Sequence, residues 1–284
     1  SHLRTFSGKI RWGTHWDLCD VALTSDGRVC IADLNNERLK LFGQDGKLWW
    51  TVRPGHGPDL KRPRRVVAGH IEEQECIIVA DWGDDSIKCF HIDTGSLTKT
   101  IRVPGVEPYA LAILREQILC TDWSTKRACL FVSDQRVRYI DTEMLDPWYM
   151  LAVPGGTLDI SDMVLVSDAS NGAVKAFTIE GSCVWSYSGP SVPTTTAFGA
   201  MGKSDSSLFK PAGLGVDEHG RVLVADCGRG CVTVLNCEGK FEQHLLGEKD
   251  SVRTPRSLAL HPKSNLLVVV DLSSFKLFVI SRNK

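Results

Sequence analysis

The segment Ile77-Ile-Val-Ala-Asp-Trp82 decides the fold: an apolar run ends in aspartate, and the chain then turns. The same phrase occurs again at five other places, ending at Asp33, Asp122, Asp168, Asp226 and Asp271. Successive aspartates lie roughly 40 to 60 residues apart, and a strand-rich repeat of about this period is typical of a β-propeller.

The sequence pattern of each repeat predicts four strands. The first begins at or near a proline, as at Pro63, Pro108 and Pro255, and proline suits the first residue of a strand because it has no N–H to donate. A tight turn leads to the apolar strand that ends in aspartate, whose nearly continuous run of apolar residues is expected when both faces are buried. A third and an outer strand follow. We therefore predict an all-β, six-bladed propeller and a single domain over residues 1–284.

The two ends of the chain are predicted to meet. The sixth repeat stops after its third strand, near Ile280, whereas a spare strand, Leu3 to Phe6, precedes the first inner strand. We expect this N-terminal strand to complete the last blade, because pairing there removes a long open sheet edge.

Bulk composition excludes little. The chain has 33 Lys and Arg against 34 Asp and Glu, a formal charge of −1, so a polyanion site must come from local segregation of charge. Hydrophobic residues make up 43% of the sequence, but they form no apolar run of about 18 residues, and we expect no membrane span.

The ten cysteines are interpreted as unpaired thiols of a reducing, cytoplasmic compartment. Cys30, Cys76 and Cys120 lie in or beside the apolar strands, where a small hydrophobic residue fits, and a chain of this size needs no disulfides. Cys227 and Cys231 lack a second ligand pair, so zinc is not expected. The repeated aspartates are interpreted as acceptors for backbone N–H groups. No metal, cofactor or catalytic residue is predicted.

The stretch from Pro211 to Asp217, followed by Val224-Ala-Asp226, resembles the NHL repeat, and the pattern extends over the whole chain. Leu18 stands where the first repeat would have proline. NHL propellers serve as RNA-binding or protein-binding ends of TRIM-NHL proteins, as amidating lyases and as receptor ectodomains. The unpaired cysteines make the TRIM-NHL C-terminal domain the best match. The resemblance implies a post-transcriptional regulator that represses mRNA; the domain itself is expected to be non-catalytic, with any RING ubiquitin-ligase region elsewhere in the full-length protein.

One end of the propeller, here called the top face, is predicted to carry the site. Strands alternate in direction, so residues that follow the first-strand proline and residues that follow the aspartate emerge together. Aromatic residues at these positions cluster in the second, third and fourth repeats, with basic residues beside them. The predicted RNA-binding residues are Arg64, Arg65, Trp82, Tyr109, Trp123, Lys126, Trp148, Lys210 and Arg256. The turns at the opposite end, the bottom, are rich in Asp and Glu and are expected to form an acidic face.

Exposed aromatic rings interleaved with cations suit single-stranded RNA, because bases stack on the rings while cations meet the phosphates. A preference for U-rich RNA is implied by the resemblance alone. Two alternatives remain open. The aromatic face could dock a peptide or protein partner, or the tryptophans could pack against neighbouring blades. An amidating-type lyase would need several histidines converging on the central channel.

Overall fold

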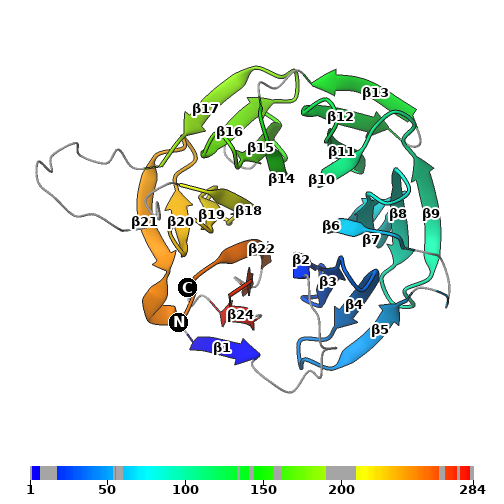
Figure 1. The fold of residues 1–284 in the computed structure, drawn as a ribbon, viewed down its shortest axis with the longest axis horizontal. Coiled ribbons are helices and arrows are strands. Elements are labelled where there is room, and N and C mark those ends of the chain that lie inside the picture. Colours follow the sequence, from blue (N-terminus) through cyan, green and yellow to red (C-terminus); the bar gives the residue numbers. More distant parts are fainter. Residues whose placement is uncertain are drawn as a thin grey trace, which may run out of the picture.

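The computed structural model describes residues 2–6, 18–53, 55, 60–132, 135–140, 144–155, 161–189, 209–261, 266–273 and 276–281. Within them, every regular element is a β-strand except one short 3-10 helix, η1 (Glu248–Asp250). The strands form six four-stranded antiparallel sheets arranged in a ring (Figure 1). The predicted all-β class and propeller arrangement are confirmed. None of the described helical segments is long and apolar enough to cross a membrane.

In each sheet the strands follow one another outward from the axis of the ring (Figure 1). The first sheet contains β2 (Leu18–Leu23), β3 (Val29–Asp33), β4 (Arg38–Phe42) and β5 (Leu48–Val52). The second contains β6 (Pro63–Ile71), β7 (Gln74–Asp81), β8 (Ser86–His91) and β9 (Leu97–Arg102). The third contains β10 (Pro108–Leu114), β11 (Gln117–Asp122), β12 (Arg127–Val132) and β13 (Gln135–Ile140).

The remaining sheets repeat this order. The fourth contains β14 (Pro147–Val153), β15 (Met163–Asp168), β16 (Ala173–Thr178) and β17 (Cys183–Tyr187). The fifth contains β18 (Pro211–Val216), β19 (Val222–Asp226), β20 (Cys231–Leu235) and β21 (Phe241–Leu246). The sixth contains β22 (Pro255–His261), β23 (Leu266–Asp271), β24 (Lys276–Ser281) and β1 (His2–Phe6).

The sixth sheet takes its outer strand from the beginning of the chain. Strand β1 pairs antiparallel with β24, with Leu3 opposite Ile280 and Phe6 opposite Leu277. The predicted closure by the N-terminal strand is confirmed: His2 lies opposite Ser281, and β1 forms the outer edge of this sheet (Figure 1).

Inner strands begin in one recurring way. Pro63 lies opposite Asp81, and the register shifts by one residue directly afterwards, so that Arg65 lies opposite Ala80. The same pairing and shift occur at Pro108, Pro147, Pro211 and Pro255, and at Leu18 in the first sheet. Such a bulge bends the inner strand. Because proline and aspartate pair directly, the residues that follow them emerge at one end of the sheet, as predicted for the top face.

The strand-ending aspartates bind the loops that enter the inner strands of their own sheets. Asp81 accepts backbone N–H bonds from Arg62 at 2.7 Å and from Lys61 at 3.0 Å, and Trp82 N–H returns a bond of 3.1 Å to the Arg62 carbonyl. Asp122, Asp168, Asp226 and Asp271 accept backbone N–H bonds from their own preceding loops in the same way. The predicted structural role is confirmed, and for these five aspartates it extends beyond their own turns.

Apolar side chains fill the space between neighbouring sheets. One such cluster joins the first two sheets through fully buried residues that include Leu39, Leu41, Ile77 and Val79. All ten cysteines are free thiols, as predicted, and Cys30, Cys76 and Cys120 are buried among the strands.

Candidate nucleic-acid interface

The top of the second sheet carries a tryptophan between two arginines. Trp82 follows Asp81 and is half-buried. The guanidinium carbons of Arg62 and Arg64 lie 4.6 Å and 5.5 Å from its ring centroid, within the range of cation–π attraction. Arg64 also contacts the next sheet: its guanidinium lies 4.1 Å from the Tyr109 ring centroid and donates a hydrogen bond to the Tyr109 hydroxyl.

The third sheet continues this array. Tyr109 and Trp123 stack with centroids 4.3 Å apart and an angle of 23° between the rings. The Lys126 ammonium lies 2.8 Å from the Trp123 centroid. Two rings at this separation leave no room for an ammonium between them, so Tyr109 covers one face of Trp123 and Lys126 covers the other. The contacts therefore run without a break from Trp82 through Arg64 and Tyr109 to Lys126.

Trp148 forms a second group nearer the axis. It follows Pro147 on β14, and the Arg256 guanidinium of β22 lies 3.9 Å from its ring centroid. Arg65 donates hydrogen bonds of 3.0 and 2.8 Å to the Trp148 carbonyl. Lys210 is exposed in the loop before β18. The structure thus brings Trp148 and Arg256 together, while no described contact joins Lys210 to either group of rings.

Two predicted residues are not on the surface. Only 2% of Arg65 and 1% of Tyr109 is exposed, so the expectation that they present exposed side chains is wrong. Both lie at the start of inner strands, where side chains from several sheets converge in the narrow centre of the ring. The Arg65 guanidinium lies 3.8 Å from the Tyr149 ring and 5.3 Å from the Tyr109 ring. These residues support the array from below.

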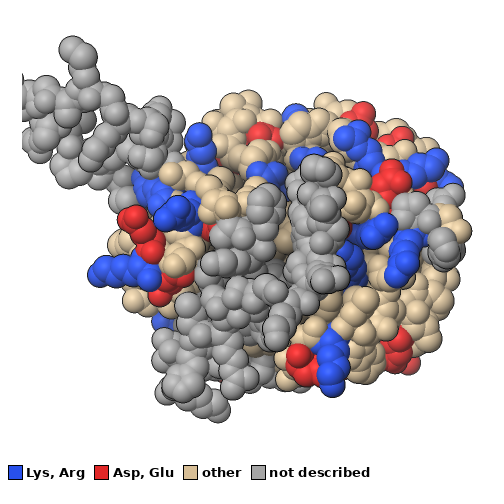
Figure 2. Space-filling model, turned by 60° about the horizontal axis from the view of Figure 1, so that its bottom comes forward, with Lys and Arg blue, Asp and Glu red and all other residues tan. Residues whose placement is uncertain are grey.

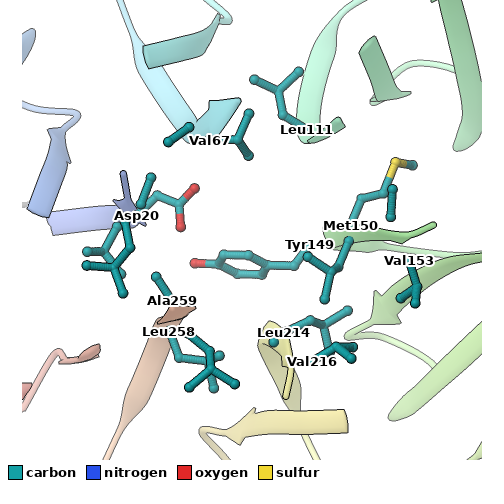
Figure 3. Close-up of a pocket in the computed structure, with 18 of the residues that line it drawn as sticks. Asp20, Val67, Leu111, Tyr149, Met150, Val153, Leu214, Val216, Leu258 and Ala259 are labelled. Carbon is teal, nitrogen blue, oxygen red and sulfur yellow. The ribbon is translucent and has the colours of Figure 1, made fainter. Parts of the chain in front are cut away.

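Sequence reasoning missed a polar layer across the axis. Asp20 of β2 accepts hydrogen bonds from the Ser257 hydroxyl at 2.5 Å and from Val66 N–H at 2.9 Å. The Tyr149 hydroxyl donates to the Cys19 carbonyl at 2.9 Å, and Figure 3 shows its ring reaching across the centre toward the side where Asp20 lies. The Asp20 bonds join the first sheet to its two neighbours, whereas the Tyr149 bond links the fourth sheet to the first across the axis. The only signal of this layer in the sequence was a single Asp or Tyr within an otherwise apolar strand.

Burial controls the charge state of this layer. Loss of water raises the pKa of the Asp20 carboxyl, and the charge of Arg65 and the bonds from Ser257 and Val66 offset this only in part. Burial likewise raises the pKa of Tyr149 to about 12, so this phenol stays protonated and keeps its donor.

The bottom turns are not an open acidic face. Arg28 pairs with Asp26 and Asp93, each at 2.9 Å. Asp45, Asp217 and Glu238 pair with Lys47, Arg221 and Lys240. The expectation of an acidic face is therefore wrong for these turns, because basic residues of the same or a neighbouring turn neutralise their carboxylates. Figure 2 also shows basic and acidic side chains interspersed over the drawn face.

Several cations of the top face differ in their partners from the basic residues of the bottom turns. Among the described residues, no ion pair engages Arg62, Arg64, Lys210 or Arg256. Burial lowers the pKa of the Arg64 guanidinium, and the neighbouring charge of Arg65 lowers it further. This repulsion makes an added anion favourable beside Arg64.

Comparisons with known proteins support the propeller fold and identify one NHL repeat. A family model described as the NHL repeat matches residues 210–235. No curated protein matches the chain. A streptogramin B lyase has a TM-score of 0.63 at 12% identity, with 99% of this chain and 98% of that chain covered.

Two further solved structures agree in fold. A catalytically inactive virginiamycin B lyase from Staphylococcus aureus, with quinupristin, has a TM-score of 0.62 at 12% identity over 98% of this chain and 88% of that one. A protein of unknown function from Bacteroides thetaiotaomicron VPI-5482 reaches 0.72 at 16% identity over 98% of this chain and 75% of that one. At such identities these likenesses concern the fold alone.

Proposed function

We propose that the top face binds single-stranded, U-rich RNA, and that the chain is the RNA-binding propeller of a TRIM-NHL-like regulator that represses mRNA in the cytoplasm. The observation that carries the proposal is the array of rings and cations that continues from the second sheet into the third. Base stacking and phosphate pairing need these two kinds of side chain in alternation.

Different residues have different tasks in this proposal. The half-buried rings of Trp82 and Trp148 offer stacking surfaces, and Trp123 offers one once the Lys126 ammonium moves off its ring. Arg64, Lys126, Lys210 and Arg256 supply positive charge for phosphates. Arg65 and Tyr109 position their neighbours, since both are buried and their polar groups bond within the protein.

The proposal is tested with a fluorescent uridine oligonucleotide at several salt concentrations. Wild type is expected to bind with an affinity that falls steeply as salt rises, because phosphate contacts release counterions. Trp82→Ala and Trp148→Ala should each lose about 1–3 kcal/mol, roughly 5- to 150-fold in Kd, with the salt slope unchanged.

Trp49 offers a matched control. It is an exposed tryptophan, 55% accessible, on the outer strand β5, and its ring contacts Arg28 of the bottom ion-pair group. Trp49→Ala should leave RNA binding unchanged. Equal losses in all three variants, or no salt dependence, would contradict the proposal. Salt-independent binding of a peptide or protein at Trp82 would instead support a docking propeller.

A further inference from the structure

A cavity of ≈ 480 Å³ occupies the axis of the propeller. All six inner strands contribute to its wall, as Figure 3 shows for the labelled residues around Tyr149. It runs from the polar layer of Asp20, Arg65 and Tyr149 to the bottom turn at Glu218. Its size falls within the range of small-molecule sites, about 300–1,000 Å³.

Small residues create this space. The wall includes Ala22, Ala68, Ala152, Gly215 and Ala259, one from each of five sheets. Larger apolar side chains such as Val67, Met150 and Leu258 stand between them (Figure 3). Since the wall is made of hydrogen-bonded inner strands, the cavity exists without rearrangement of the backbone, and a ligand need not pay to open it.

At the end of the cavity formed by the polar layer, polar side chains point into the cavity. The Asp20 carboxyl and the Tyr149 ring both project toward the centre (Figure 3). Arg65, which is 2% exposed, has five N–H donors; three of its hydrogen bonds are to carbonyls, two to Trp148 and one to Arg64. No ion pair within hydrogen-bonding reach joins Arg65 to a carboxylate among the described residues. A buried guanidinium therefore keeps donor capacity beside an apolar chamber.

These features select one class of ligand. The apolar wall favours a compact hydrocarbon body. Asp20 and Arg65 have opposite charges at the same end, so an ionic head of either sign would meet one repulsive neighbour and lose its water as well. A hydroxyl or carbonyl oxygen can accept a bond there without that penalty.

We propose that the axial cavity is a binding site for a small, neutral, compact apolar molecule that carries one hydroxyl or carbonyl group. The site is separate from the top-face array, and the two proposals stand or fall independently.

A series of probes with one body and three heads tests this. 1-Adamantanol, 1-adamantylamine and 1-adamantanecarboxylate share the same cage, but at pH 7 they carry a neutral, a positive and a negative head. Calorimetric titration of the whole chain should show saturable binding of the alcohol. Binding of the amine and of the carboxylate should be weaker by roughly tenfold or more, because each buries a charge.

A second test of the proposal uses substitutions that fill the cavity. Ala152→Leu and Ala259→Leu place extra volume into it from two different sheets, and each should abolish alcohol binding while the melting transition is retained. Ala169→Leu, the same change in a top loop outside the wall, is the control and should bind as wild type does. The proposal is overturned if the alcohol fails to bind wild type, if all three heads bind alike, or if a folded filled variant binds normally.

Discussion

At the scale of single residues, the most informative position is the fourth after each strand-ending aspartate. Glu37, Asp85 and Lys126 occupy it with φ of 50°, 49° and 59°, and glycine occupies it in the fourth and fifth repeats. This left-handed backbone suits glycine and strains other residues. At Lys126 the strained residue also holds its ammonium over Trp123. The ring is therefore covered until that ammonium moves.

Lys126→Gly has two opposing effects on stability: it relieves the strained backbone, and it removes the ammonium that lies over the Trp123 ring. Relief of the left-handed backbone should raise the free energy of unfolding by up to about 1 kcal/mol, reduced by about 0.5–1 kcal/mol for the lost cation–π contact. Glu37→Gly relieves the equivalent strain in the first repeat and is the control. Urea unfolding should show the larger gain for Glu37→Gly; equal gains would mean that the ammonium contact contributes nothing.

The same pair of variants makes a prediction for RNA binding. Lys126→Gly uncovers one face of Trp123 but removes a cation, so its salt slope should fall by about one unit. It should bind uridine oligonucleotide more tightly than wild type at high salt and less tightly at low salt. Parallel lines for the two proteins in a plot of log Kd against log salt would rule out exchange of the ammonium for a base.

At the scale of elements, strand β1 decides whether the ring is closed. It supplies the outer strand of the sixth sheet through pairing with β24 alone. Without β1, the edge of β24 presents unpaired N–H and C=O groups.

Deletion of residues 1–7 should therefore lower the melting temperature by several degrees and increase self-association. Scanning calorimetry and light scattering measure the two effects. A peptide that spans residues 1–7, added in excess, should restore part of the lost stability, because it binds only the folded form. Unchanged melting after the deletion would show that β1 contributes no stability.

At the scale of the whole molecule, the polar layer joins opposite sides of the ring. Asp20 binds the Val66 backbone of the second sheet and Ser257 of the sixth, while Tyr149 of the fourth binds the Cys19 carbonyl of the first. A ring of sheets can distort when one side moves independently of the other. The Tyr149 bond across the axis and the Asp20 bonds between neighbouring sheets together limit that freedom, and we expect them to raise the cooperativity of unfolding.

Asp20→Asn tests the cost of the buried charge. Because burial raises the pKa of Asp20 in the folded protein, the native state binds a proton more tightly than the unfolded chain does. The resulting stabilisation is present at low pH and is lost as pH rises through the folded pKa. The stability of wild type relative to Asp20→Asn should therefore decrease from pH 4 to pH 8 in urea unfolding. A constant difference would show that the carboxyl is not perturbed.

The sequence alone predicts those features of the fold that depend on residues close together in the chain. The phrase that ends at Asp81, the proline before each inner strand and the spare strand at Leu3 were sufficient for the class, the repeat and the closure. Burial of Arg65 and Tyr109 was not predictable, because it depends on how closely side chains of different sheets approach at the axis. The ion pairs of Arg28 were also missed, since Asp93 belongs to the neighbouring sheet.

Closure by β1 has a consequence for the order in which the protein is made. Strand β1 leaves the ribosome before the other strands of the propeller, and its partner β24 follows only after the other sheets have been synthesised, roughly 15 to 55 seconds later at about 5–20 residues per second. During that interval β1 has no native partner. On polysomes, where several nascent chains are close together, the β1 strand of one copy can pair with the finished β24 of another. Exchanged dimers should therefore become more frequent as translation becomes denser, and dilution of the mature protein should not reproduce them.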